Sequence, residues 1–413
     1  MEERRRVFAY LIAALAILGA LFFALRYEPE PAPAPPRRDL LARYRAVALE
    51  RRGGTYPFVF DRRGRPLVSY VMATKASVPV SPEFAPLASW KTGAKHRIET
   101  TLDAGIQRIA YTSLGELRAS LVAIDPRTNE VLAVASTGPD PLERQYEPGS
   151  VIKVLTLLAA LGSGVDVASL FPYDCRGALE IDGRSFGDWY AGGHGRLPDV
   201  DEALARSCNV AFAAIGLRAG RDRLLEFHHR AGFDTQLDLG LFQVPLGRTV
   251  GEIFNHFETG FYSIGLEHET VTTLHLAMLA SMAANRGALT TPRLYRARRT
   301  ILGDVIARPP RQTTGVLVPR AAAERVVAAM EAVVTRPQGT GRRARVDGVT
   351  LALKTGTAGS REQGYDALIF GFAPVDHPRI AFAVIAENVG SAEVAAAKVT
   401  HDFIEGLRAG GHL

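Results

Sequence analysis

The chain has 413 residues, of which 47% are hydrophobic and 22% are charged, and this is the composition of an ordinary globular protein. Its length allows two or three domains with a large core. The net charge of +6 comes from dispersed arginines rather than from a basic block interleaved with aromatic residues, which argues against nucleic acid as a partner.

The first clear pattern lies in residues 7–25, a run of 19 residues without a charge. This is about the length needed to cross a bilayer. Arg4, Arg5 and Arg6 precede the run and favour an N-terminus on the inside. We therefore expect a cytoplasmic tail at residues 1–6, a single transmembrane anchor at 7–25, and the rest of the chain outside the cytoplasm. A cleaved signal peptide is the alternative interpretation.

A spacer and a small module come next. Residues 26–38 are rich in proline, which predicts a stiff, extended linker. Residues 39–97 start with an amphipathic helix pattern over 39–52 and continue with two short strands around a turn at 61–64, which predicts a hairpin. We interpret 39–97 as a juxtamembrane module in which no residue pattern indicates chemistry.

The remaining residues, 98–413, form the predicted main domain. It starts with a helix at 103–117, a mostly helical segment occupies its middle from 150 to about 332, and a helix closes it from residue 392. Strand patterns occur at both of its ends, at 120–125, 130–135, 349–354, 367–370 and 380–385. We expect an α/β (α+β) fold with one antiparallel sheet built from both chain ends, helices packed on it and a helical insert.

The most informative stretch of this domain is the turn Pro148-Gly149 followed by Ser150 and Lys153, with the apolar run 154–161 behind it. Ser150 and Lys153 lie on one face of the first turn of a buried helix. A lysine in apolar surroundings can lose its proton and act as a base. The chain contains only six lysines among its 49 basic residues. Because arginine cannot give up its proton, this scarcity favours a chemical role for Lys153 over a solvated lysine beside a helix-capping serine.

Two further polar clusters interrupt apolar patterns. Ser207 and Asn209 precede the run 210–215, which by itself is typical of a helix start. Lys354-Thr355-Gly356-Thr357 ends a strand pattern, and a lysine with hydroxyls around a glycine is suited to binding a carboxylate. A second Lys-Thr-Gly sequence at residues 91–93 precedes the predicted strands, and we interpret it as a loop.

Ser150-x-x-Lys153, Ser207-x-Asn209 and Lys354-Thr355-Gly356, in this order, resemble the active-site motifs of penicillin-recognising serine enzymes. The resemblance covers about residues 98–405 and extends to the segments 100–107, 123–126, 131–135, 192–195, 284–287, 339–341 and 371–374, which look like those of a penicillin-binding transpeptidase domain. It is greatest for the elongation-type class B proteins, here with a reduced N-terminal module.

The resemblance implies a peptidoglycan D,D-transpeptidase that cross-links stem peptides and is inhibited by β-lactams. Ser150 would be the nucleophile, Lys153 its base, Ser207 a proton relay to the departing D-alanine, and Asn209 the residue that holds Lys153. Lys354, Thr355 and Thr357 would bind the terminal carboxylate of the stem peptide, and Gly356 would let it approach closely. The backbone N–H groups of Ser150 and Thr357 would form the oxyanion hole, and no metal or organic cofactor is required.

The resemblance also implies a single-pass protein of the bacterial cytoplasmic membrane, with the catalytic domain on the periplasmic side and a multi-span glycosyltransferase as its partner. Two alternatives stay open. A β-lactamase or D,D-carboxypeptidase would transfer the acyl group to water. A non-catalytic β-lactam sensor, or a scaffold for a membrane glycosyltransferase, would catalyse no reaction.

The two cysteines, Cys175 and Cys208, both lie in the part expected outside the cytoplasm. A disulfide between them could form there, and two buried free thiols are the alternative. The histidines, His194 among them, show no ligand spacing, so we expect them to be structural and expect no metal site.

Overall fold

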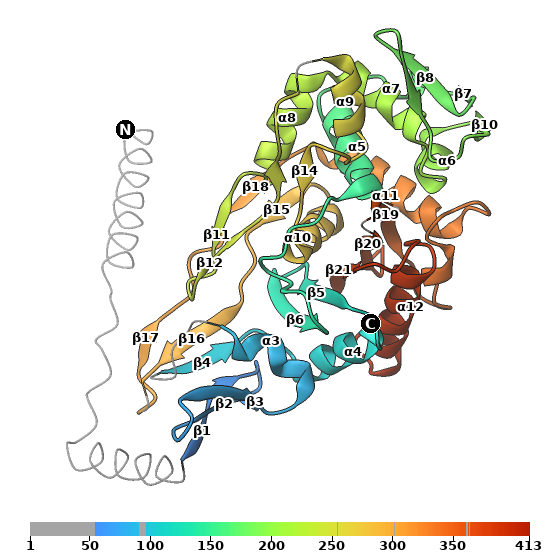
Figure 1. Cartoon of the computed structure of the whole chain (residues 1–413). Helices are drawn as coiled ribbons and strands as arrows, with labels where there is room; N and C mark the ends of the chain where they lie inside the picture. The colour runs from blue at the N-terminus through green and yellow to red at the C-terminus, as the bar shows by residue number, and fades with distance from the viewer. Residues whose placement is uncertain (1–53, 91–95, 254, 301, 361, 363) are drawn as a thin grey trace, which may run out of the picture. The chain divides into compact units, whose positions relative to one another are not determined.

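The computed structural model describes residues 54–90, 96–253, 255–300, 302–360, 362 and 364–413 (Figure 1). The predicted tail, anchor and linker at residues 1–38, the predicted helix at 39–52 and the second Lys-Thr-Gly sequence at 91–93 lie outside these residues. No helix within the described ranges has the length and apolar character needed to span a membrane.

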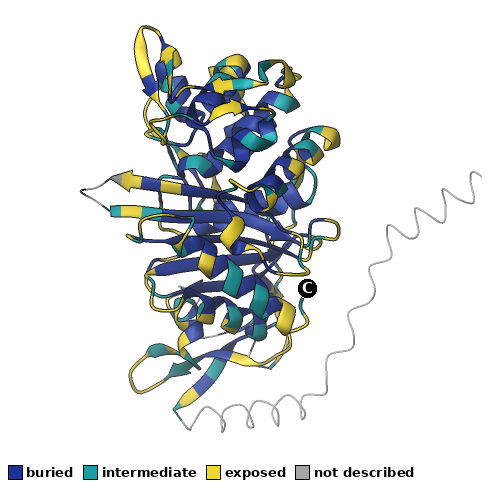
Figure 2. Cartoon of the chain, turned by 90° about the vertical axis from the view of Figure 1, so that its right-hand side faces the viewer, coloured by how far each residue is buried: buried dark blue, intermediate teal, exposed yellow. Residues whose placement is uncertain are grey.

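A five-stranded sheet lies at the centre, with the order β19 (Ala352–Ser360), β20 (Gly364–Ala373), β21 (Ile380–Ala386), β5 (Ala119–Asp125) and β6 (Glu130–Ser136). All its neighbouring strands are antiparallel. β5, β6 and β21 are buried along their whole length, as the dark central strands of Figure 2 show. The prediction of one antiparallel sheet made from both ends of the domain is confirmed.

Helices cover both faces of this sheet. Ser120, which pairs with Ile385 across the strands, hydrogen bonds through its hydroxyl to Thr273 of α10 (Thr273–Ala284). Phe382 contacts Phe403 of α12 (Ala395–Ala409). Because side chains alternate along a strand, Phe382 and Ile385 point to opposite faces. α10 therefore packs on one face, whereas α12, together with α4 (Ala104–Leu114), packs on the other.

The segment between β6 and β19 contains most of the helices, as predicted, but it also forms short two-stranded ribbons that the sequence patterns did not reveal. Its helices are α5 (Lys153–Gly162), α6 (Val200–Ala205), α7 (Asn209–Ala219), α8 (Arg221–Arg230), α9 (His256–Tyr262), α10 and α11 (Arg320–Thr335). α5 contacts α7, α8 and α11, so the helix with the apolar run lies inside this group.

A second, six-stranded sheet has the order β17 (Val305–Ala307), β16 (Tyr295–Arg299), β4 (Arg97–Thr100), β1 (Thr55–Phe60), β2 (Pro66–Val71) and β3 (Ala76–Pro79). β1 and β2 form the predicted hairpin. The position expected for a domain boundary, residue 97, is the first residue of β4, in the middle of this sheet. The sheet is completed by β16 and β17, which come from far along the chain, and residues 51–413 form one compact unit.

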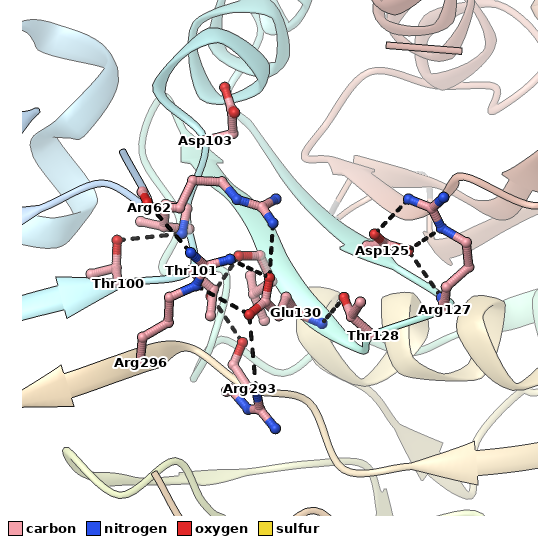
Figure 3. Close-up of polar contacts among 12 residues, drawn as sticks. Arg62, Thr100, Thr101, Asp103, Asp125, Arg127, Thr128, Glu130, Arg293 and Arg296 are labelled. Carbon is pink, nitrogen blue, oxygen red and sulfur yellow. Dashed lines mark hydrogen bonds and ion pairs between the residues drawn. The ribbon is translucent and has the colours of Figure 1, made fainter. Parts of the chain in front are cut away.

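One buried carboxylate connects the two sheets (Figure 3). Glu130, the first residue of β6, accepts hydrogen bonds from Arg62 Nη2 at 2.9 Å and from Arg296 Nη2 at 3.0 Å. Arg62 follows β1 and Arg296 belongs to β16, while Arg293 forms a longer ion pair of 4.0 Å with the same carboxylate. Glu130 therefore anchors the six-stranded sheet to the edge of the central one.

Candidate active site

Ser150 lies in a short 3₁₀ turn, Gly149–Ile152, that leads directly into α5. Its side chain does not cap the helix, so the helix-capping alternative for Ser150 is wrong. Gly149 has a φ of +57°, and a Cβ at this position would lie 2.7 Å from the carbonyl oxygen of Thr357. Glycine is therefore required here, because it allows the turn that carries Ser150 to touch strand β19.

Lys153 begins α5 and is completely buried. Its Nζ lies 2.9 Å from Ser150 Oγ, 2.6 Å from Asn209 Oδ1 and 2.7 Å from the carbonyl oxygen of Ser207. Burial lowers the pKa of Lys153 to about 8, although nearby Asp188 and Cys208 oppose this shift. A neutral amine has two hydrogens and one lone pair. With both hydrogens donated to the Asn209 and Ser207 oxygens, the lone pair remains for the Ser150 hydroxyl.

Ser207 lies between α6 and α7 and connects the two buried lysines. Its Oγ is 3.2 Å from Lys153 Nζ and 3.0 Å from Lys354 Nζ. Its backbone has a φ of +57°, which is uncommon for a residue with a side chain and holds the hydroxyl in this position. The N-cap of α7 is Cys208, whose sulfur accepts a hydrogen bond from the Ala211 N–H.

Lys354 lies in β19 and is also completely buried. Its Nζ contacts Ser207 Oγ and donates to the carbonyl oxygen of Thr355 at 2.8 Å. Burial, and after it the charge of Lys153, lowers the pKa of Lys354 well below its ordinary value. Two amines that share one serine hydroxyl repel each other when both are charged, so at least one of them is favoured in its neutral form.

The strand β19 forms one edge of the central sheet and passes beside the Ser150 turn. A Cβ on Gly356 would lie 2.7 Å from the carbonyl oxygen of Pro148, so glycine allows this close approach. Thr355 Oγ1 bonds to Thr340 Oγ1 at 2.7 Å, and Thr357 is exposed. The Lys354–Thr357 motif thus presents hydroxyls next to the serine.

A cavity of about 540 Å³ joins these residues. Its wall includes the predicted Ser150, Ser207, Asn209, Thr355, Gly356 and Thr357. Lys153 and Lys354 lie buried behind this wall, in contact with Ser150 and Ser207. Thr340, from the segment 339–341 named above, also belongs to the wall, and residue patterns did not indicate other members such as Trp189, Tyr365 and Glu393. A larger cavity of about 720 Å³, beside Arg221 and His256, contains none of the predicted residues.

A second cluster adjoins Ser207 and Asn209 and consists of Cys175, Asp188, His194 and Cys208. Their ligand atoms all lie within 4.8 Å of one another. The two sulfurs are 3.4 Å apart and both thiols are free, so the structure contains the predicted pair as neighbours without the bond. His194, which we expected to be only structural, places Nδ1 3.5 Å from the sulfur of Cys175.

The donor set of this cluster suits a divalent metal. Two sulfurs, an imidazole nitrogen and a carboxylate oxygen in a buried site are ligands typical of tetrahedral Zn²⁺. Burial would raise the pKa of the Asp188 carboxyl, but hydrogen bonds from His194 and Cys208 lower it below its ordinary value. Asp188 Oδ2 also accepts the Asn209 N–H at 2.9 Å, which connects the cluster to the active site. These four residues could therefore hold a metal, although the sequence predicted none.

Comparison with known proteins agrees with this site. The family model described as "Penicillin binding protein transpeptidase domain" matches residues 119–405. The peptidoglycan D,D-transpeptidase PbpA of Mycolicibacterium smegmatis is 29% identical over 354 residues, which cover 74% of this chain and 70% of the relative. MrdA of Acinetobacter baumannii, also named a peptidoglycan D,D-transpeptidase, is 32% identical over 342 residues, which cover 70% of this chain but only 50% of the relative.

Solved structures show the same fold. The D,D-transpeptidase domain of a peptidoglycan glycosyltransferase from Eggerthella lenta superposes with a TM-score of 0.73 at 22% identity, covering 87% of this chain and all of that one. Penicillin-binding protein A of Mycobacterium tuberculosis, in a ceftriaxone acyl-enzyme complex, gives 0.74 at 21% identity, covering 87% and 99%. From the family match over most of its main domain, together with the three motifs assembled around one cavity, this chain belongs to the penicillin-binding protein transpeptidase family.

Proposed function

We propose that this protein is a class B peptidoglycan D,D-transpeptidase that acts through a Ser150 acyl-enzyme. The observation that carries the proposal is the placement of Lys153 Nζ 2.9 Å from Ser150 Oγ, with Asn209 Oδ1 and the Ser207 carbonyl oxygen to accept its two hydrogens. This arrangement directs the lone pair of the Lys153 amine toward the hydroxyl of Ser150. Several relatives are named peptidoglycan D,D-transpeptidases, and the chain spans about half the length of some of them.

The reaction follows from these contacts. Ser150 Oγ attacks the carbonyl carbon of the bond between the two D-alanines while Lys153 takes the hydroxyl proton. Ser207, in contact with both lysines, passes a proton to the nitrogen of the departing D-alanine. The amine of a second stem peptide then attacks the acyl-enzyme, which forms the cross-link and frees Ser150. A β-lactam carbonyl would be attacked in the same way, and its ring nitrogen stays attached to the acyl group.

We infer that Lys354, Thr355 and Thr357 hold the terminal carboxylate. Thr355 and Thr357 line the cavity, and the amine of Lys354 is buried behind them, in contact with the carbonyl oxygen of Thr355. Ser150 and Thr357 both belong to the cavity wall, as the proposed oxyanion hole requires.

A zinc ion in the cluster of Cys175, Asp188, His194 and Cys208 would have a structural role. These residues would hold it, and its charge would stabilise the thiolates of Cys175 and Cys208. The proton transfers described above involve none of these four side chains.

Labelling with fluorescent penicillin tests the proposed function. We expect covalent label on the wild type, none on Ser150→Ala, and slow loss of label after the free drug is removed. Rapid loss would support a β-lactamase or carboxypeptidase instead. Formation of cross-linked dimers from stem peptides separates the transpeptidase from a non-catalytic sensor or scaffold, because a sensor would be labelled without turnover.

We also propose the location predicted from the first 38 residues: a single anchor at 7–25 in the bacterial cytoplasmic membrane, a linker at 26–38, and the catalytic domain on the periplasmic side. The uncharged run and the arginines before it support this proposal. Protease accessibility of the catalytic domain in intact spheroplasts tests it. Co-purification with a multi-span glycosyltransferase would identify the partner that the resemblance implies.

A further inference from the structure

Glu393 contributes the only carboxylate to the wall of the active-site cavity, as far as the described residues are concerned. Glu393 follows β21 in a short segment that is hydrogen-bonded to the strand of Lys354–Thr357. The Ala392 N–H donates to Thr357 Oγ1 at 3.3 Å, and the Glu393 N–H donates to Ser391 Oγ at 3.2 Å. The Glu393 backbone is therefore positioned by the strand that binds the substrate.

Glu393 is half-buried, and the ion pairs among the described residues do not include it. Glu393 is also close enough to Lys354 that its charge partly opposes the lowering of the pKa of that lysine. A negative charge at this place repels the terminal carboxylate of a stem peptide. The negative charge of Glu393 would instead attract a positively charged group of the substrate.

The wall of the same cavity also has apolar members. Trp189, Leu266 and Tyr365 line it, and Trp189 is 57% exposed while Tyr365 is 37% exposed. Exposed rings in the same cavity as a carboxylate suit a ligand with an aliphatic chain that ends in an ammonium group, because rings can cover methylenes and also attract a cation.

We propose that Glu393 determines specificity by binding an aliphatic ammonium group of a stem peptide. This proposal rests on the proposed transpeptidase function. Two groups have this chemistry: the side-chain amine of the donor residue that precedes the two D-alanines, and the amine of the acceptor peptide before it loses its proton. In both cases Glu393 favours the charged substrate and takes no part in the acylation of Ser150.

The experiment measures donor and acceptor separately. In the donor arm, release of D-alanine is followed with Nα-acetyl-L-Lys-D-Ala-D-Ala whose side-chain amine is either free or acetylated. In the acceptor arm, a benzoyl-D-alanyl thioester without an amine is the donor, and the concentration of Nα-acetyl-L-lysine is varied. Wild type is compared with Glu393→Gln and Glu393→Asp, and with Glu226→Gln, which removes an equivalent charge from the exposed surface of α8.

For the donor source, we expect the free amine to be preferred about fivefold or more over the acetylated one, Glu393→Gln to lose this preference, and Glu393→Asp and Glu226→Gln to keep it. For the acceptor source, Glu393→Gln raises the KM for the acceptor by a similar factor with little change in kcat. The proposal is overturned when Glu393→Gln matches the wild type in both arms, that is, in its preference between the free and the acetylated donor and in its KM for the acceptor.

Penicillin labelling separates this test from that of the proposed function. A wild type that is labelled by penicillin but indifferent to the ammonium group contradicts only the role of Glu393. A wild type that is not labelled contradicts the acyl-enzyme itself.

Discussion

The amine of Lys153 donates a hydrogen bond to Oδ1 of Asn209 at 2.6 Å, the shortest of its four side-chain and backbone contacts. This bond orients the lysine, and because Asn209 is neutral it does so without favouring the charged amine. A carboxylate at position 209 would keep the geometry but stabilise the ammonium form.

We therefore expect Asn209→Asp to move the pH dependence of penicillin acylation upward by about one pH unit or more, because the pKa of Lys153 rises beside a negative charge. Stopped-flow acylation rates between pH 6 and 10 measure this shift. Asn209→Ala is the control, since it removes the tether without adding a charge. If the acylation rate of Asn209→Asp has the same pH dependence as that of the wild type, the ionisation of Lys153 does not determine this pH dependence.

For the wild type, the acylation rate should rise with pH and level off above about 8, where burial places the pKa of Lys153. The sign follows from the lowered pKa: the amine is charged and inactive as a base below this value and neutral above it. Well below the pKa, the rate should fall about tenfold for each unit of pH. A rate that stays constant from pH 6 to 9 would be inconsistent with a lysine base.

Lys153→Arg should reduce acylation by about a thousandfold or more, although it keeps the positive charge, because the guanidinium cannot take the Ser150 proton. Penicillin labelling measures the loss, and circular dichroism shows whether the variant folds. Lys398→Arg, on the exposed side of α12, is the matched control and should acylate at the wild-type rate. Normal acylation by Lys153→Arg would remove Lys153 from the role of base.

Purified protein should contain about one zinc per chain, bound by the four residues of the Cys175–Cys208 cluster. Cys208→Ser should lower both the zinc content and the melting temperature, because a thiolate ligand is lost. Elemental analysis and thermal unfolding with and without a chelator measure these effects. His256→Ala changes an exposed histidine outside the cluster and should alter neither quantity. Zinc-free protein whose melting temperature does not respond to added Zn²⁺ would rule out the site.

Glu130→Gln should destabilise the fold by about 2 kcal/mol, because it leaves the arginines that converge on this carboxylate without their counter-charge. These arginines are partly exposed, so water offsets part of the loss. Denaturant unfolding gives the change, and Glu324→Gln, which breaks a surface pair with Arg320, should cost at most about 0.5 kcal/mol. Equal effects of the two variants would mean that Glu130 does not hold the sheets together.

Local patterns predicted the strands of the central sheet and singled out Ser150, Lys153 and Lys354, whereas a role for Ser207 and Asn209 came from the family resemblance. The apolar run behind Lys153 predicts burial, the alternation before Lys354 predicts a strand, and the scarcity of lysine indicates that both positions need an amine. These properties depend on residues within one or two helical turns or a few strand positions, and the order of such residues can be read directly from the sequence.

Contacts between distant segments were decided only by the tertiary structure. Residues 39–97 were expected to form a separate module, but β4, which starts at residue 97, pairs with β1 on one side and with β16 on the other, so strands from far along the chain extend the same sheet. Cys175, Asp188, His194 and Cys208 have no regular spacing, yet the chain folds back and brings their ligand atoms together. Glu393 is unremarkable in sequence and becomes the carboxylate of the cavity because Ala392 bonds to Thr357. The positions of these groups depend on packing between elements far apart in the chain, which local periodicity does not encode.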